Sequence, residues 1–110
     1  MKYKIIKLDG RYSHRSRFSH MLEFYKGHVT MSKVLDYDRA CRWFVDHFGW
    51  AADVEVQMTM RSNRRAMPNI YTDDDFNDSW AHCSKYDDYR IYVKSTKELE
   101  WFLLANPNET

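Results

Sequence analysis

Residues 80–107 read WAHCSKYDDYRIYVKSTKELEWFLLANP and carry the clearest structural signals in the chain. Apolar and polar residues alternate over 89–94, which is typical of a β-strand with one buried face. Asp87-Asp88 fits a two-residue turn between this strand and an earlier strand that begins at Trp80. The first part of the stretch therefore predicts a β-hairpin.

The second part predicts a helix after Ser95. Ser95 and Glu98 have the spacing of a capping box, in which each side chain accepts a hydrogen bond from an unpaired backbone amide. Asn106-Pro107 stops the helix. The apolar residues of this helix fall on two sides, one formed by Leu99, Phe102 and Leu103 and the other by Trp101 and Leu104.

The N-terminal third contains one clear strand and one ambiguous segment. Residues 3–8 are β-prone, and Asp9-Gly10 ends them. Residues 18–34 fit a strand through Phe18, His20, Leu22 and Phe24, and a helix through Phe18, Met21, Leu22 and Tyr25. The density of aromatic residues favours the strand, with Lys26-Gly27 as the turn of a hairpin into His28–Val34.

Asp36–Phe48 predicts an amphipathic helix, with Asp36 as its N-cap and Gly49 ending it in a left-handed conformation. Trp43 lies outside the apolar stripe of this helix, one turn from Arg39. The stripe itself consists of Tyr37, Ala40, Cys41, Phe44 and Phe48.

Val54–Arg61 alternates strictly between apolar and polar residues and predicts another strand. Residues 62–79 follow as a long irregular loop, which in a small domain is usually functional or mobile. We therefore expect a single domain over 1–110 with an α+β fold. It is a two-layer sandwich, in which two helices pack on one face of a mainly antiparallel sheet of four to five strands.

The composition limits the classes of function. The 110 residues include 17 Lys+Arg and 16 Asp+Glu, so a net charge of +1 gives no general attraction to nucleic acid or membrane. The opening residues lack the apolar core of a secretion signal, and no run is long enough to span a membrane. We expect an intracellular, cytoplasmic protein in which Cys41 and Cys83 are reduced thiols.

Catalytic and metal-binding motifs are weak. Asp73, Asp75 and Asn77 match the first ligands of a calcium loop, but Asp78 replaces the required glycine and Ser84 the required glutamate. No zinc-ligand spacing, nucleophile motif or phosphate-binding glycine loop occurs. We expect no cofactor, no metal and no enzyme activity. A metal-dependent enzyme using Asp73, Asp75 and Asp78 is the remote alternative.

Two features suggest binding. Trp101 and Leu104 project away from the predicted sheet, and Trp43 with Arg39 is a similar off-stripe pair, which predicts contact with a protein partner or a second copy. The alternative is RNA or single-stranded DNA binding through arginines interleaved with aromatic residues. These arginines form two groups, Arg11, Arg15 and Arg17, and Arg61, Arg64 and Arg65.

Three blocks of the sequence resemble small uncharacterised accessory proteins of large tailed phages, cyanophages in particular. These blocks are residues 4–11 (KIIKLDGR), 42–49 (RWFVDHFG) and 90–104, where RIYVK and WFLL carry the likeness. The resemblance implies a viral protein made in the cytoplasm of a bacterial host. It carries no activity with it and favours a small binding module.

Overall fold

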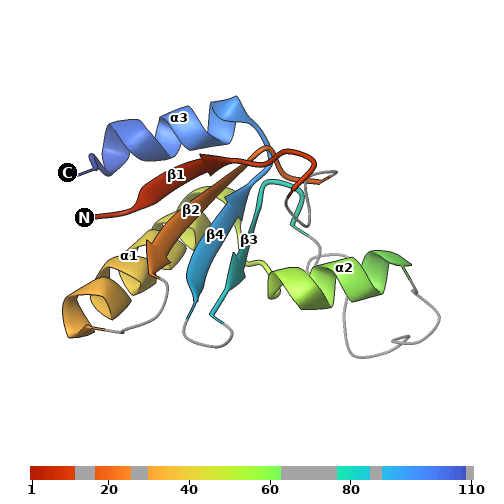
Figure 1. Ribbon diagram of the computed structural model, residues 1–110, viewed down its shortest axis with the longest axis horizontal. Helices are drawn as coiled ribbons and strands as arrows, with labels where there is room; N and C mark the ends of the chain where they lie inside the picture. The colour runs from red at the N-terminus through yellow and green to blue at the C-terminus, as the bar shows by residue number, and fades with distance from the viewer. Residues whose placement is uncertain (12–16, 26–29, 63–76, 85–87, 109–110) are drawn as a thin grey trace.

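The computed structural model describes residues 1–11, 17–25, 30–62, 77–84 and 88–108. They form a four-stranded antiparallel sheet with the order β1-β2-β4-β3 (Figure 1). The predicted α+β fold is thereby confirmed. The strands are β1 (Lys4–Lys7), β2 (His20–Tyr25), β3 (Trp80–Cys83) and β4 (Tyr89–Val93).

Two hairpin-helix halves of the described chain meet at the central pair β2 and β4, and α2 lies between these halves in the sequence. Each half is a β-hairpin followed by a helix, α1 (Met31–Phe48) after β2 and α3 (Thr96–Ala105) after β4. Strands β2 and β4 pair antiparallel and join the two hairpins into one sheet. Each helix crosses to the far half. Phe44 of α1 stacks on Trp80 of β3, and Phe102 of α3 packs on Tyr3 beside β1.

The main core lies between α1, α3 and one face of the sheet. The ring of Phe44 is fully buried at its centre, with ring centroids 5.3 Å from Trp80 and 5.0 Å from Phe102. The predicted stripe of α1 faces this core, with Tyr37, Ala40 and Phe44 buried and Cys41 and Phe48 partly buried. The two helices on one face of the sheet are as predicted.

The start of α1 differs from the prediction. The helix begins at Met31, with Thr30 as its N-cap, so the predicted strand over His28–Val34 is wrong from Met31 onward. Met31, Val34 and Leu35 have helical spacing, but Met31 and Leu35 are 73% and 50% exposed, so the first turns contribute little to the core. Asp36 is not the cap but accepts a hydrogen bond from the backbone N–H of Lys2 at 3.2 Å. The predicted turn at Lys26-Gly27 lies outside the described residues.

Val54–Ser62 forms a helix, α2, so the strand predicted over Val54–Arg61 is wrong. Asp53 caps this helix, because its carboxylate accepts the N–H of Glu55 at 2.9 Å. Val54 and Gln57, three residues apart, are both fully buried, and Gln57 Nε2 donates to the carbonyl of Ala52 at 3.0 Å. The polar side of the apparent alternation therefore contains a buried residue, and the helical spacing decides the structure.

Helix α2 packs against the sheet face opposite α1 and α3, beside β3 (Figure 1). It is an addition to the two helices that the sequence predicts. Its Val54, with Met58 at the margin, joins a second apolar cluster that includes Leu8, Phe18, Met21, Ala81, Cys83 and Tyr92.

The hairpin and the helix of 80–107 form as predicted, apart from the details of the helix cap. Strand β3 pairs with β4 from Trp80↔Val93 to Cys83↔Arg90, and Asp87 of the predicted turn lies outside the described residues. Ser95 is the N-cap of α3, but its hydroxyl donates to the Glu98 carboxylate, and no capping bond to a backbone amide forms. At the other end, the backbone N–H of Asn106 donates to Phe102 at 2.8 Å.

Residues 49–53 connect α1 to α2 without regular structure, yet side chains near β3 hold their carbonyls. Asn77 Nδ2 lies 2.8 Å from the carbonyl of Phe48 and 3.2 Å from those of Gly49 and Trp50. Trp80 Nε1 donates to Gly49 at 2.8 Å. The connector is therefore fixed to the sheet edge. Of the predicted loop over 62–79, residues 63–76 lie outside the described residues.

Candidate functional site

An aromatic patch lies on the outer side of α1 and α3, away from the sheet. We define it as Trp43, His47 and Phe48 of α1 with Trp101 of α3. The Trp101 ring stands nearly perpendicular to the other three, at 82° to 86°, with centroid distances of 5.1 Å to Phe48, 5.3 Å to His47 and 5.9 Å to Trp43. These edge-to-face arrangements are the favoured geometry for aromatic pairs.

Local helix geometry builds the α1 side of the patch. His47 Nδ1 donates to the carbonyl of Trp43 one turn earlier at 2.8 Å. This bond lays the imidazole flat on the indole of Trp43, with centroids 4.1 Å apart and an interplanar angle of 20°. The stacked pair then forms the surface against which Trp101 stands, so the exposed indole of Trp101 is held in one orientation.

The patch is partly open to solvent. Trp101 is 45% exposed despite its three ring contacts, and Leu104, three residues further along the same side of α3, is 84% exposed. Arg39 lies one turn before Trp43, with 68% of its side chain exposed, and forms an ion pair with Asp36 at 3.6 Å. The structure thus brings Trp43 and Trp101 together and places Leu104 and Arg39 on the flanks of the patch.

Sequence reasoning missed His47 as a member of this patch. The helical stripe placed Phe48 in the core, and His47 was not among the predicted contact residues. The i, i+4 spacing of Trp43 and His47 is a signal that could have found the stacked pair. The contact with Trp101, more than fifty residues further along the chain, has no such local signal.

The charged residues around the patch carry both signs. On α1, Arg39 and Asp46 are exposed within one helical turn of Trp43. On α3, Lys97 and Glu100 are exposed on either side of Trp101. A mixed rim of this kind can form ion pairs with a partner that also carries both signs.

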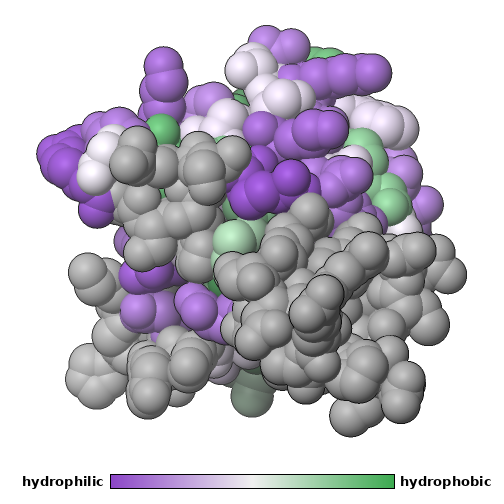
Figure 2. Space-filling view, turned by 90° about the vertical axis from the view of Figure 1, so that its right-hand side faces the viewer, coloured by the Kyte–Doolittle hydropathy of each residue, from purple (hydrophilic) through white to green (hydrophobic). Residues whose placement is uncertain are grey.

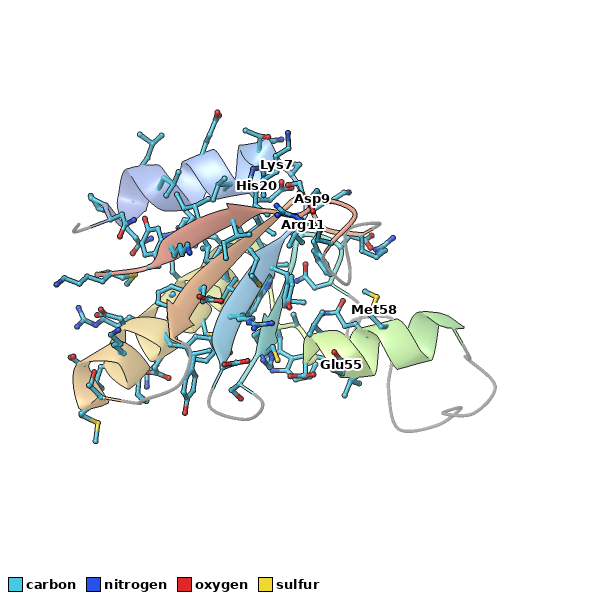
Figure 3. All side chains as sticks on the ribbon, viewed as in Figure 1. Lys7, Asp9, Arg11, His20, Glu55 and Met58 are labelled. Carbon is cyan, nitrogen blue, oxygen red and sulfur yellow. The ribbon has the colours of Figure 1, made fainter. Side chains whose placement is uncertain are left out.

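The predicted nucleic-acid arginines that the structure describes are paired with aspartates. Arg11 donates to both carboxylate oxygens of Asp9, at 3.2 Å and 3.0 Å, next to Lys7 and His20 (Figure 3). Arg17 donates to Asp78 at 2.6 Å. Each pairing reduces the local positive charge that a phosphate would meet.

The remaining arginines of that prediction are not described at the side-chain level. Arg15, Arg64 and Arg65 lie outside the described residues, and Arg61 is described only as part of the α2 backbone. Figure 2 views the molecule from the side of α2, where the described surface is mainly hydrophilic with scattered apolar residues.

No metal site is present among the residues that the structure describes, since they contain no cluster of three or more His, Cys, Asp or Glu side chains. Asp73 and Asp75 of the acidic segment lie outside them, and Asp78 is bonded to Arg17. Cys41 and Cys83 are not joined in a disulfide. Burial raises the pKa of Cys41 to about 12, so at neutral pH it is a protonated thiol and a poor nucleophile.

Comparison with protein-family models, curated proteins and solved structures finds no match for this chain. Among the described residues, no helix is both long and apolar enough to cross a membrane. The function must therefore be argued from the geometry of the site.

Proposed function

We propose that this chain is a non-enzymatic binding module that contacts a protein through the aromatic patch of α1 and α3, with a second copy of itself as the partner. The observation that carries the proposal is the 45% exposure of Trp101 in a fixed orientation, beside the 84% exposed Leu104.

The geometry of Trp101 suits an interface anchor. Tryptophan is enriched among the residues that contribute most to binding free energy, and such anchors sit in ordered surroundings. Ring contacts from Trp43, His47 and Phe48 already restrict the indole before any partner arrives. Binding would therefore cost little side-chain entropy and remove apolar area from water.

The mixed charges around the patch favour a second copy of the chain. Both helices present acidic and basic residues beside the patch: Arg39 and Asp46 are exposed on α1, and Lys97 and Glu100 on α3. In a two-fold dimer the same patch contacts itself, so a surface with both signs can be complementary to its own copy. A strongly acidic or strongly basic partner would find no matching field on this rim.

Sedimentation equilibrium of the full chain at about 100 μM, where weak dimers associate, tests this proposal. We expect the mass of a dimer for the wild type and of a monomer for Leu104→Lys, which places a charge in the proposed contact. Leu35→Lys is the matched control, since Leu35 is an exposed leucine of α1 outside the patch. A monomeric wild type, or dissociation by the control alone, would refute the second copy as partner.

A further inference from the structure

Strand β1 is one outer edge of the sheet, and half of its backbone groups point away from β2 (Figure 1). The N–H of Leu8 donates to the carbonyl of Ser19 at 2.9 Å, so Leu8 belongs to a hydrogen-bonded pair. Such pairs alternate with non-bonded pairs along an antiparallel ladder, which turns the N–H and C=O groups of Ile5 and Lys7 outward. No described residue forms a hydrogen bond with these outward groups.

The preceding outward residue of this edge, Tyr3, already holds an added amide group. Its backbone N–H donates to Oδ1 of Asn108 at 3.1 Å, and Nδ2 of Asn108 donates to its carbonyl at 2.7 Å. The Asn108 side chain thus takes the place that the backbone of a neighbouring strand would occupy. Ile5 and Lys7 continue the same outward row, without such a partner among the described residues.

The side chain of Ile5 lies uncovered at the margin of the main core. Ile5 pairs with Leu22 of β2, so both side chains are on the sheet face that α1 and α3 cover. Leu22 is fully buried, whereas Ile5 is 41% exposed. An apolar residue directly opposite Ile5 on an added strand would cover this exposed side chain.

Lysines set the charge of this edge. Residues 1–8 read MKYKIIKL, with three exposed lysines and no acidic residue. Neither Lys4 nor Lys7 forms an ion pair with a described residue. The nearby carboxylates of Glu23 and Asp36 are 18% and 17% exposed, and each faces an arginine, at 3.9 Å and 3.6 Å. Lysines on an edge disfavour pairing with a second copy, because like charges would meet across the ladder, but they attract an acidic strand.

We propose that the β1 edge binds an extended acidic segment of another protein as an additional antiparallel strand. The backbone groups of Ile5 and Lys7 would form the ladder hydrogen bonds, and an apolar side chain of the segment would cover Ile5. Carboxylates of the segment would lie opposite Lys4 and Lys7. No residue of this edge belongs to the aromatic patch of α1 and α3, so the inference does not depend on the proposed self-association.

A peptide with the sequence Glu-Val-Val-Glu, blocked at both ends, tests the inference. In the antiparallel register its glutamates lie opposite Lys4 and Lys7, and its valines lie opposite Ile5 and Ile6. Binding to the full isotope-labelled chain is followed by NMR through the backbone amide signals of Ile5 and Lys7. We expect the peptide at millimolar concentration to shift both signals and to slow their exchange with solvent. A Lys-Val-Val-Lys peptide should bind about tenfold more weakly, because it sets like charges opposite each other.

Two N-methylated forms of the acidic peptide separate strand addition from charge attraction. The N–H of the second valine, opposite Ile5, points toward β1, and the N–H of the first valine, opposite Ile6, points away. We expect methylation of the second valine to weaken binding about fivefold and methylation of the first to leave binding unchanged.

Three results would overturn the inference. The first is an acidic peptide that shifts neither amide signal, and the second is equal affinity of the two methylated forms. The third is protection of the Ile5 amide that grows with the concentration of the chain alone, because it would place a second copy at the edge.

Discussion

The indole of Trp101 in α3 stands edge-on to the indole of Trp43 in α1, with centroids 5.9 Å apart and planes at 86°. This contact joins the two hairpin-helix halves of the chain on the side away from the sheet. Trp43 also packs inward, with its centroid 5.2 Å from that of Phe102 and 5.0 Å from that of Phe44. Trp43 is therefore a bridge between the core and the surface, whereas Trp101 is held by the surface cluster.

The two tryptophans should contribute differently to stability. We expect Trp43→Ala to lower the free energy of unfolding by about 3 kcal/mol, because a partly buried ring with contacts to Phe44 and Phe102 leaves a cavity. Trp101→Ala should cost about 1 kcal/mol, since its ring is 45% exposed. Urea denaturation of the monomeric state measures both. A larger loss for Trp101→Ala would contradict this assignment.

Gly49 should tolerate no side chain without cost. Its φ of 91° with ψ of 169° lies in a region that only glycine adopts easily, while a Cβ would meet only ordinary contact with Asn77 Nδ2 at 3.7 Å. We expect Gly49→Ala to lower the free energy of unfolding by about 2 kcal/mol through backbone strain. Gly10→Ala is the control, because nothing lies within 4 Å of its Cβ position. Equal effects of the two substitutions in thermal unfolding would refute the backbone explanation.

The Asn77 side chain should be needed to hold the connector. Its amide nitrogen donates to the carbonyls of Phe48, Gly49 and Trp50. Asn77→Asp keeps the shape but sets an anion against these carbonyls, so we expect a loss of about 2 kcal/mol. Asn106→Asp is the matched control: its side chain donates to one carbonyl, which also accepts the Asn106 backbone N–H. If chemical denaturation shows the same loss for Asn106→Asp as for Asn77→Asp, the Asn77 amide has no special role in holding the connector.

Stability should fall in alkaline solution because of Cys41. Burial raises the pKa of this thiol from its ordinary 9.0 to about 12, so the folded chain keeps a proton that the unfolded chain loses. The stabilisation is fully present below pH 9.0 and is lost as the pH rises toward about 12. Tyr37, whose pKa burial also raises, acts in the same direction. Denaturation at a series of pH values should give a shallower fall for Cys41→Ala, and an identical slope would contradict the argument.

His20 should titrate below its ordinary pKa of 6.5, first because of burial and second because of the positive charge of Lys7, its cross-strand neighbour (Figure 3). The neutral form is favoured in the fold, so this stabilisation is present above pH 6.5 and is lost as the pH falls. We expect Lys7→Gln to raise the pKa of His20 in an NMR titration. Lys4→Gln, on the same strand beside Glu23, is the control and should leave it unchanged.

Helices α1 and α3 were predictable from the sequence because the buried residues of each helix lie on the single side that faces the core. Phe44 and Ala40 of α1, and Leu99 and Phe102 of α3, repeat at helical spacing and are all buried. The hairpin β3-β4 was predictable for the same reason at a period of two residues, with Ile91 and Val93 on the core side. Trp101 and Leu104 were placed on the far side by the same periodicity, and they are exposed.

The class of fold and the outward direction of Trp101 could therefore be predicted from periodicity, because periodicity sets which side of a helix meets the core. The helix over Val54–Ser62 depends on tertiary packing, because the burial of Gln57 requires the carbonyl of Ala52 and the neighbouring strand β3. Tertiary packing also places Trp101 against His47. It brings Tyr37 and Trp50 to the walls of one pocket. Contacts between residues far apart in the chain follow from how the elements pack, and no local pattern encodes them.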